Sequence, residues 1–158
     1  YGRLNMYTLK VALLFLILFY ASISAQFFAE RLITDPFTQN ISSLKDSLGT
    51  KAFEESEIKG LTTITYYDWL EPVSIKITYM FKKDGAQVGK FISNAKQNEE
   101  DAEKAYNLLK RILVNKFGSS YTETSLLGLT MLMWKGDQNA TVMLIRKGTS
   151  AKLTVMKI

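Results

Sequence analysis

Two carboxylates beside an aromatic side chain are the first candidates for chemistry in this sequence. Asp68 and Glu71 flank Trp69 near the end of a predicted strand. Glycoside hydrolases use a pair of carboxylates, one as an acid and the other as a base or nucleophile. Because such a spacing is common by chance, a carboxylate-dependent hydrolase is the least favoured of three functional hypotheses.

Histidine and cysteine are both absent from the 158 residues. Their absence excludes histidine as a general base or metal ligand, and it excludes thiol chemistry and zinc–thiolate sites. The acidic runs at 54–57 and 99–103 fit solvated turn and helix N-terminal charges, because no calcium-loop spacing accompanies them. We therefore expect the protein to bind no cofactor and no metal, and we favour a protein that is not an enzyme.

Four aromatic residues are candidates for contact with a ligand or partner: Tyr66, Tyr67, Trp69 and Trp134. Tyrosine and tryptophan are amphipathic and are favoured at interfaces. Tyr66 and Tyr67 are adjacent in a predicted strand and therefore point to opposite faces of it. At least one of them must lie away from a helix-covered face.

The N-terminal residues predict an export signal. Lys10 precedes an uncharged apolar run from Val11 to Tyr20, and mostly small residues follow up to Ala25. This is the layout of a secretory signal, with Met6 as its start. We expect residues 1–25 to be a signal peptide and the protein to be secreted or periplasmic, meeting the membrane only transiently. An uncleaved anchor is the alternative, although the run is short of the about 20 residues that span a bilayer.

The elements that would position these residues are two helices and about six strands. Periodicity predicts a short helix over 40–49 and a long amphipathic helix over 99–117, capped by Asn98. Alternation and turn residues predict strands over 61–69, 73–81, 87–93, 125–134, 140–146 and 151–158. The fold class is α+β, a mostly antiparallel sheet of about six strands with the long helix packed on one face, in the order short α-βββ-α-βββ.

The predicted organisation is an N-terminal lead-in with the short helix, residues 26–55, followed by a single α+β domain, residues 56–158. The strands of the C-terminal half are apolar on both faces, although one helix covers only one face. Something must therefore cover the second face. The favoured cover is the N-terminal segment with Phe27, Phe28, Phe37 and its short helix; a homodimer or a ligand groove is the alternative.

The net charge of +5 is mild and partly belongs to the signal segment, so nucleic acid is not expected as a partner. The favoured function is a small exported, non-catalytic envelope or secreted binding or accessory protein, with an unknown protein or small ligand as its partner. The first alternative is a secreted enzyme inhibitor or immunity-type protein. It would project the loop Lys82–Ala86 or Lys135–Asn139.

Overall fold

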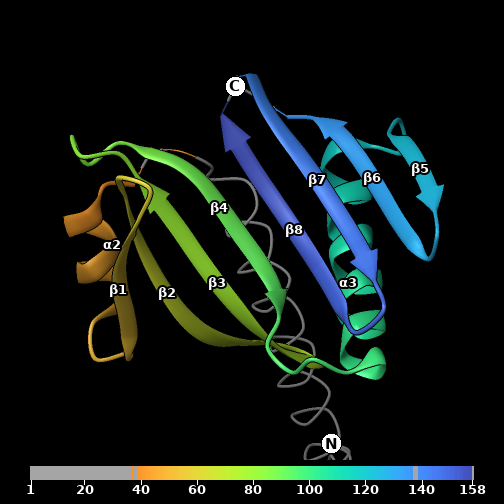
Figure 1. Cartoon of the computed structure of the whole chain (residues 1–158), viewed down its shortest axis with the longest axis horizontal. Coiled ribbons are helices and arrows are strands. Elements are labelled where there is room, and N and C mark those ends of the chain that lie inside the picture. The colour runs from red at the N-terminus through yellow and green to blue at the C-terminus, as the bar shows by residue number, and fades with distance from the viewer. Residues whose placement is uncertain (1–36, 38, 137–138, 158) are drawn as a thin grey trace, which may run out of the picture.

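A computed structural model describes residues 37, 39–136 and 139–157 of the chain. The predicted signal peptide lies outside the described residues, as do Phe27 and Phe28. The elements in chain order are α2 (Ile41–Leu48), β1 (Phe53–Ile58), β2 (Leu61–Leu70), β3 (Val73–Phe81), β4 (Gln87–Asn94), α3 (Glu99–Phe117), β5 (Thr122–Leu126), β6 (Leu129–Lys135), β7 (Ala140–Lys147) and β8 (Ser150–Lys157). Figure 1 shows one broad, twisted sheet with α3 behind β7 and β8.

The strands form a single antiparallel sheet in the order β1-β2-β3-β4-β8-β7-β6-β5. Each half of the chain is a helix followed by a four-stranded meander, and the two meanders join where β4 pairs with β8. Phe91 and Thr154 are opposite each other near the middle of this seam. The predicted fold class, α+β with an antiparallel sheet, is confirmed.

The number of strands is a correction to the prediction. The described residues form eight strands and two helices in the order α-ββββ-α-ββββ, instead of about six strands in the order α-βββ-α-βββ. The first addition is β1, whose six residues are all exposed at the sheet edge. Its three glutamates hide the alternation that marks a half-buried strand, and charges of this kind protect an edge from pairing. The predicted boundary between residues 55 and 56 falls inside this strand.

The second addition comes from residues 125–134, which the sequence predicts as one strand. Leu127 and Gly128 have φ angles of 48° and 76°, so the chain reverses there and forms the β5–β6 hairpin. Positive φ at both central residues is the geometry of the two-residue hairpin turn that fits the twist of a sheet. Leucine rarely adopts it, which is why the turn is not visible in the sequence.

The long helix α3 has the predicted bounds and the predicted cap. The side chain of Asn98 accepts a hydrogen bond of 2.8 Å from the backbone N–H of Asp101. One stripe of the helix is buried against β3, β4, β7 and β8. Its residues are Ala102, Ala105, Tyr106, Leu108, Leu109, Ile112 and Leu113.

The short helix α2 lies on the same side of the sheet as α3. Leu44 joins the core beneath it, and Phe37 packs against that core. Lys45 binds Glu55 at 2.6 Å, and Lys51 binds Asp68 at 2.7 Å. Because both carboxylates occur on the face that α3 covers, α2 and Phe37 do not cover the second face of the sheet.

Candidate functional site

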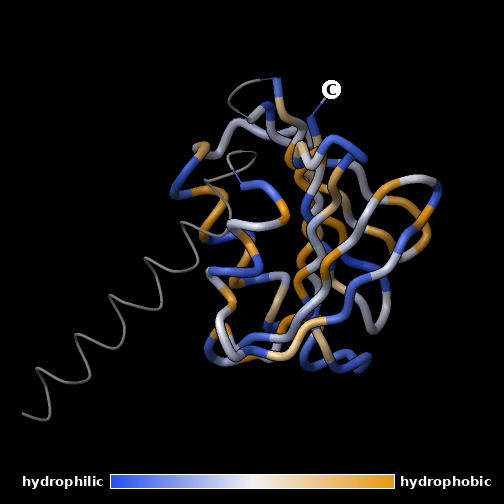
Figure 2. The backbone as a smooth tube through the Cα atoms, turned by 90° about the vertical axis from the view of Figure 1, so that its left-hand side faces the viewer, coloured by the Kyte–Doolittle hydropathy of each residue, from blue (hydrophilic) through white to orange (hydrophobic). Residues whose placement is uncertain are grey.

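The two faces of the sheet differ because α2 and α3 lie on the same one of them. Val73, Ile75 and Ile77 of β3 are buried under the helices, and the residues between them point to the other side. We call that other side the open face, since no helix of the described residues packs on it. In β3 the buried apolar residues alternate with Ser74, Lys76 and Thr78, whereas β7 is apolar on both faces from Val142 to Ile145. Figure 2 shows hydrophobic and hydrophilic stretches along the chain.

The four aromatic residues predicted as contacts fall into two pairs. Tyr66 and Trp134 lie on the helix-covered face and are 5% and 1% exposed. Tyr66 stacks on Tyr79, and burial raises the pKa of Tyr66, with the charge and hydrogen bond of Tyr79 adding to the effect. Tyr67 and Trp69 lie on the open face and are 52% and 62% exposed. Only this second pair is available to a partner.

Large exposed hydrophobic side chains gather on the open face. Cross-strand partners in a sheet share a face, so the strand registers place each of them. Six belong to the open face: Ile58, Tyr67, Trp69, Leu126, Met133 and Met156. Of the remaining two, Phe53 lies on the helix side and Leu127 lies in the β5–β6 turn. Most of the large exposed hydrophobic side chains of the described residues therefore lie on the face that no described helix covers.

Methionines form the centre of this surface. Every methionine of the described residues lies on the open face: Met80, Met131, Met133, Met143 and Met156. Met133 and Met143 are opposite each other on β6 and β7. Methionine is unbranched and polarizable, and surfaces rich in it adapt to partners of varied shape. The sequence shows this feature most directly as Met131 and Met133, two residues apart in one strand, a signal that attention to aromatic residues alone misses.

Lysines surround the methionines. On the open face of β3, β4, β8, β7 and β6, the charged residues are Lys76, Lys152, Lys147 and Lys135. Within the described residues, no carboxylate shares that face on these five strands. The Nζ atom of Lys152 lies 4.1 Å from the centroid of the Phe91 ring, a cation–π contact that holds the ammonium over the apolar centre.

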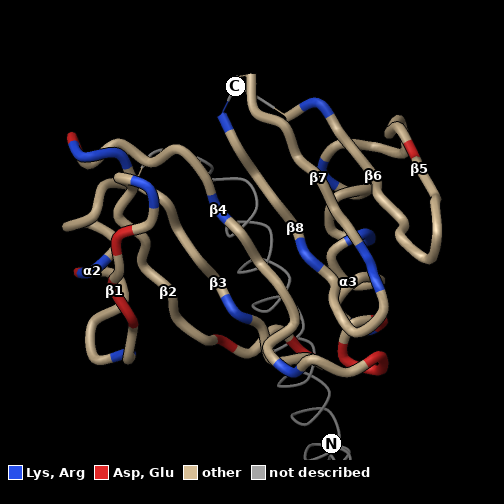
Figure 3. Tube along the Cα trace, in the orientation of Figure 1, with Lys and Arg blue, Asp and Glu red and all other residues tan. Residues whose placement is uncertain are grey.

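Most acidic residues are placed elsewhere. Figure 3 shows acidic residues on α2, on β1, near the β2–β3 turn, at the β3–β4 turn, on β5 and at the start of α3. Glu54 of the edge strand β1 shares the open face, because it pairs with Thr65. Within the helix run, Lys104 binds Glu100 and lowers the pKa of that carboxyl. The described residues contain no group of three acidic side chains that could hold a metal ion. The acidic run of α3 therefore complements the helix dipole.

Asp68 and Glu71, the two carboxylates first considered for catalysis, lie in different surroundings. Asp68 lies on the helix side, where it binds Lys51 and accepts a hydrogen bond from the backbone N–H of Trp69. Glu71 is exposed in the β2–β3 turn. The adjacent Trp69 points to the open face, away from Asp68. The three side chains thus do not converge on one substrate position.

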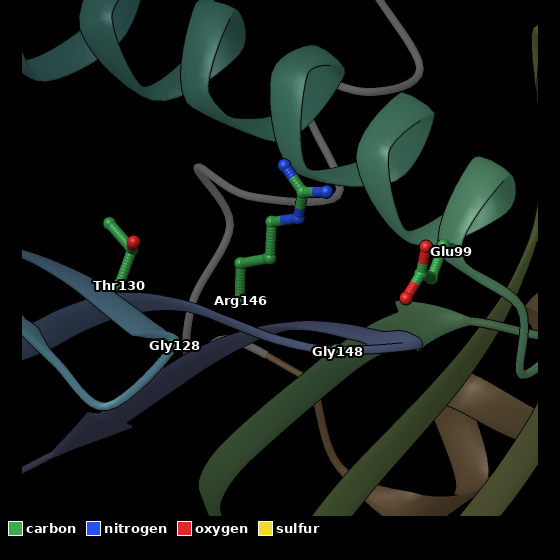
Figure 4. A pocket seen from close by; sticks show the side chains of 5 residues that line it. All are labelled: Glu99, Gly128, Thr130, Arg146 and Gly148. Carbon is green, nitrogen blue, oxygen red and sulfur yellow. The ribbon is translucent and has the colours of Figure 1, made fainter.

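A cleft of about 360 Å³ lies between the start of α3 and two turns of the sheet (Figure 4). Arg146 rises from β7 towards the helix, and its Nη2 atom lies 3.8 Å from a carboxylate oxygen of Glu103. The other lining side chains are Glu99 and Thr130, with Gly128 and Gly148 in the turns. Glu99 and Arg146 thus bring opposite charges to the lining of the cleft.

The structure describes the first of the two loops predicted to project from an inhibitor in full and the second only in part. In the β3–β4 turn, the N–H of Gly85 donates to the carbonyl of Lys82, and the side chain of Asp84 accepts from Ala86. This loop is short and internally bonded. The second loop includes residues 137 and 138, which lie outside the described residues.

Comparison with known proteins gives no further assignment. No protein-family model, curated protein or solved structure matches the chain. None of the helices in the described part of the chain has the length and apolar character needed to cross a membrane.

Proposed function

We propose that this chain is a small exported, non-catalytic binding protein that holds its partner on the open face. The observation that carries the proposal is the gathering of exposed apolar side chains there, with Trp69 62% exposed. Exposed tryptophan, tyrosine and methionine side chains on a face that no described helix covers suit a binding role, because these residue types are enriched at protein interfaces. The lack of histidine and cysteine in the sequence supports a role without catalysis.

Export is the second part of the proposal and is supported by the apolar run from Val11 to Tyr20 behind Lys10. Expression with export tests it by the intact mass of the purified protein. A mass that corresponds to a start at Gln26 or Ala25 supports a cleaved signal. Retention of the full N-terminal segment on the isolated protein would contradict it.

Partner capture with matched variants tests the binding role. Met133→Glu places a charge on the open face, whereas Phe53→Glu places one on the helix side; the two parent residues are 36% and 37% exposed. The parent protein and both variants are immobilised and exposed to extract of the source cells, and bound material is compared by mass spectrometry. We expect the Met133 variant alone to lose the partner.

The comparison is valid only for folded variants, so circular dichroism and thermal unfolding accompany each capture. Equal capture by the parent and by the Met133 variant would contradict the role of the open face. A Trp69→Ser variant gives a second measurement at the other end of the same face, because its parent side chain is largely exposed and contributes little to the core.

A further inference from the structure

Building on the proposed function, we infer that the partner presents an acidic amphipathic helix to the open face. The apolar stripe of that helix would cover the methionines, and its carboxylates would meet the surrounding lysines. The charge of the face, the pairing of its strands, its shape and the chemistry of its centre all favour such a helix.

The charge of the open face selects a negatively charged partner. Lys76, Lys152 and Lys147 lie towards one end of the strands and Lys135 towards the other, with no described carboxylate between them on β3 to β6. Opposite charges across an interface steer encounter and fix register, whereas like charges oppose it. Two open faces stacked on each other would bring lysine against lysine. A second copy of the chain is therefore disfavoured.

Strand pairing excludes a partner that adds to this part of the sheet as another strand. Each of the five strands β3, β4, β8, β7 and β6 has a hydrogen-bonded neighbour on both sides. Strand addition needs a free edge, and among the described strands only β1 and β5 lie at an edge of the sheet. A partner on the open face must therefore bind through side chains.

The shape of the sheet favours an elongated, convex partner. Neighbouring strands of a sheet are rotated by roughly 20–25°, so a sheet of this width is saddle-shaped. A planar bilayer touches only the raised corners of a saddle, whereas a helix lies along its hollow. The opposite face gives a direct precedent, because α3 packs across β3, β4, β7 and β8. Five strands at about 4.8 Å spacing give a width of roughly 19 Å, the length of about 13 helical residues.

The centre of the face suits an apolar stripe of mixed side chains. Met133 and Met156 are 36% and 40% exposed, and Met143 and Phe91 are half-buried between them. Flexible thioethers can fill the gaps between leucine, isoleucine or phenylalanine of a partner helix. This adaptability matches the helix-in-groove mode of recognition, in which an apolar helix face docks on a hydrophobic surface.

Synthetic peptides test the inference directly. A labelled peptide of about 18 residues carries a leucine stripe and glutamates elsewhere; its counterpart carries lysines in place of the glutamates. Binding to the exported protein is followed by fluorescence anisotropy. We expect the acidic peptide to bind at least about tenfold more tightly than the basic one, and to weaken between about 50 mM and 500 mM salt.

Charge reversal identifies the lysines responsible. In the variant Lys76→Glu with Lys152→Glu, the affinity for the acidic peptide should fall roughly tenfold or more, and the basic peptide should gain. The matched control, Lys83→Glu with Lys116→Glu, makes the same change of charge in the β3–β4 turn and on α3. This control should bind the acidic peptide within about twofold of the parent, since screened distant charges contribute little.

Several results would overturn the inference while leaving the proposed function intact. One is loss of the captured partner in Met133→Glu without any preference for the acidic peptide. Another is binding to vesicles of phosphatidylserine and phosphatidylcholine in place of the peptide, and a third is a dimer in light scattering that Met133→Glu dissociates. Equal capture by the parent and by Met133→Glu is a different result, because it removes the proposed function itself.

Discussion

The indole Nε1 of Trp134 donates a hydrogen bond of 3.0 Å to the carbonyl oxygen of Gly118. The residue is 1% exposed, and its ring contacts Tyr121 with centroids 4.9 Å apart. Gly118 ends α3, and Trp134 belongs to β6. This single side chain therefore fixes the end of the long helix to the second meander.

Replacing Trp134 by phenylalanine should lower the free energy of unfolding by about 2–4 kcal/mol, because it leaves the Gly118 carbonyl without its donor and opens a gap in the core. Urea unfolding followed by circular dichroism measures the change. Trp69→Phe is the matched control, since Trp69 is 62% exposed, and it should stay within about 0.5 kcal/mol of the parent. Equal effects from the two substitutions would contradict the assignment of Trp134 to the core.

The sequence predicts those elements whose local signals agree with their burial. The helix α3 has a cap, a dipole-matched charge distribution and a clean apolar stripe, and both of its ends are predicted correctly. The β3–β4 turn also lies at the predicted loop Lys82–Ala86, where Gly85 adopts φ 82°. Edge strand β1 is missed because none of its residues is buried.

The candidate surface was predicted only in part. Two-sided apolar strands in the C-terminal half indicate correctly that the second face is apolar, and Tyr67 and Trp69 lie on it. Residue type alone does not separate them from Tyr66 and Trp134, since the face of a strand residue depends on register. The register follows from pairings between distant segments such as β4 and β8, which no local pattern specifies.

Asn94 joins the two meanders at the end of their seam. Its side chain is 1% exposed; it donates to the carbonyls of Thr149 and Lys96 and accepts from the N–H of Ala151. Asn94→Ala should lower the free energy of unfolding by about 1–3 kcal/mol, because the buried N–H of Ala151 loses its acceptor and two part-buried carbonyls lose their donor. Hydrogen exchange should show faster opening of the β7–β8 turn. The neighbouring Ser93→Ala, on the open face, should cost less than about 1 kcal/mol, and a similar loss in both variants would contradict this role.

Tyr66 gives the fold a dependence on alkaline pH. Burial, followed by the charge and hydrogen bond of Tyr79, raises the pKa of Tyr66. Above about pH 10 the unfolded chain releases this proton and the folded chain retains it, so stability is full below that pH and falls as the pH rises beyond it. Urea unfolding between about pH 8 and pH 11 should show this fall, and Tyr66→Phe should reduce its slope. Tyr67→Phe, at an exposed position, should keep the parental slope; a slope unchanged by Tyr66→Phe would contradict the prediction.

Leu127 occupies a strained position in the β5–β6 turn. It has φ 48° and is 92% exposed, so it bears the steric cost of a left-handed conformation without burying its side chain. Leu127→Asn creates the Asn-Gly pair that this turn prefers and should raise the free energy of unfolding by about 0.5–1.5 kcal/mol. The neighbouring Leu126→Asn removes a leucine of 66% exposure outside the positive-φ region and should change stability by less than about 0.5 kcal/mol. Thermal unfolding of the two variants separates relief of backbone strain from the removal of exposed apolar surface, because only strain relief distinguishes position 127 from position 126.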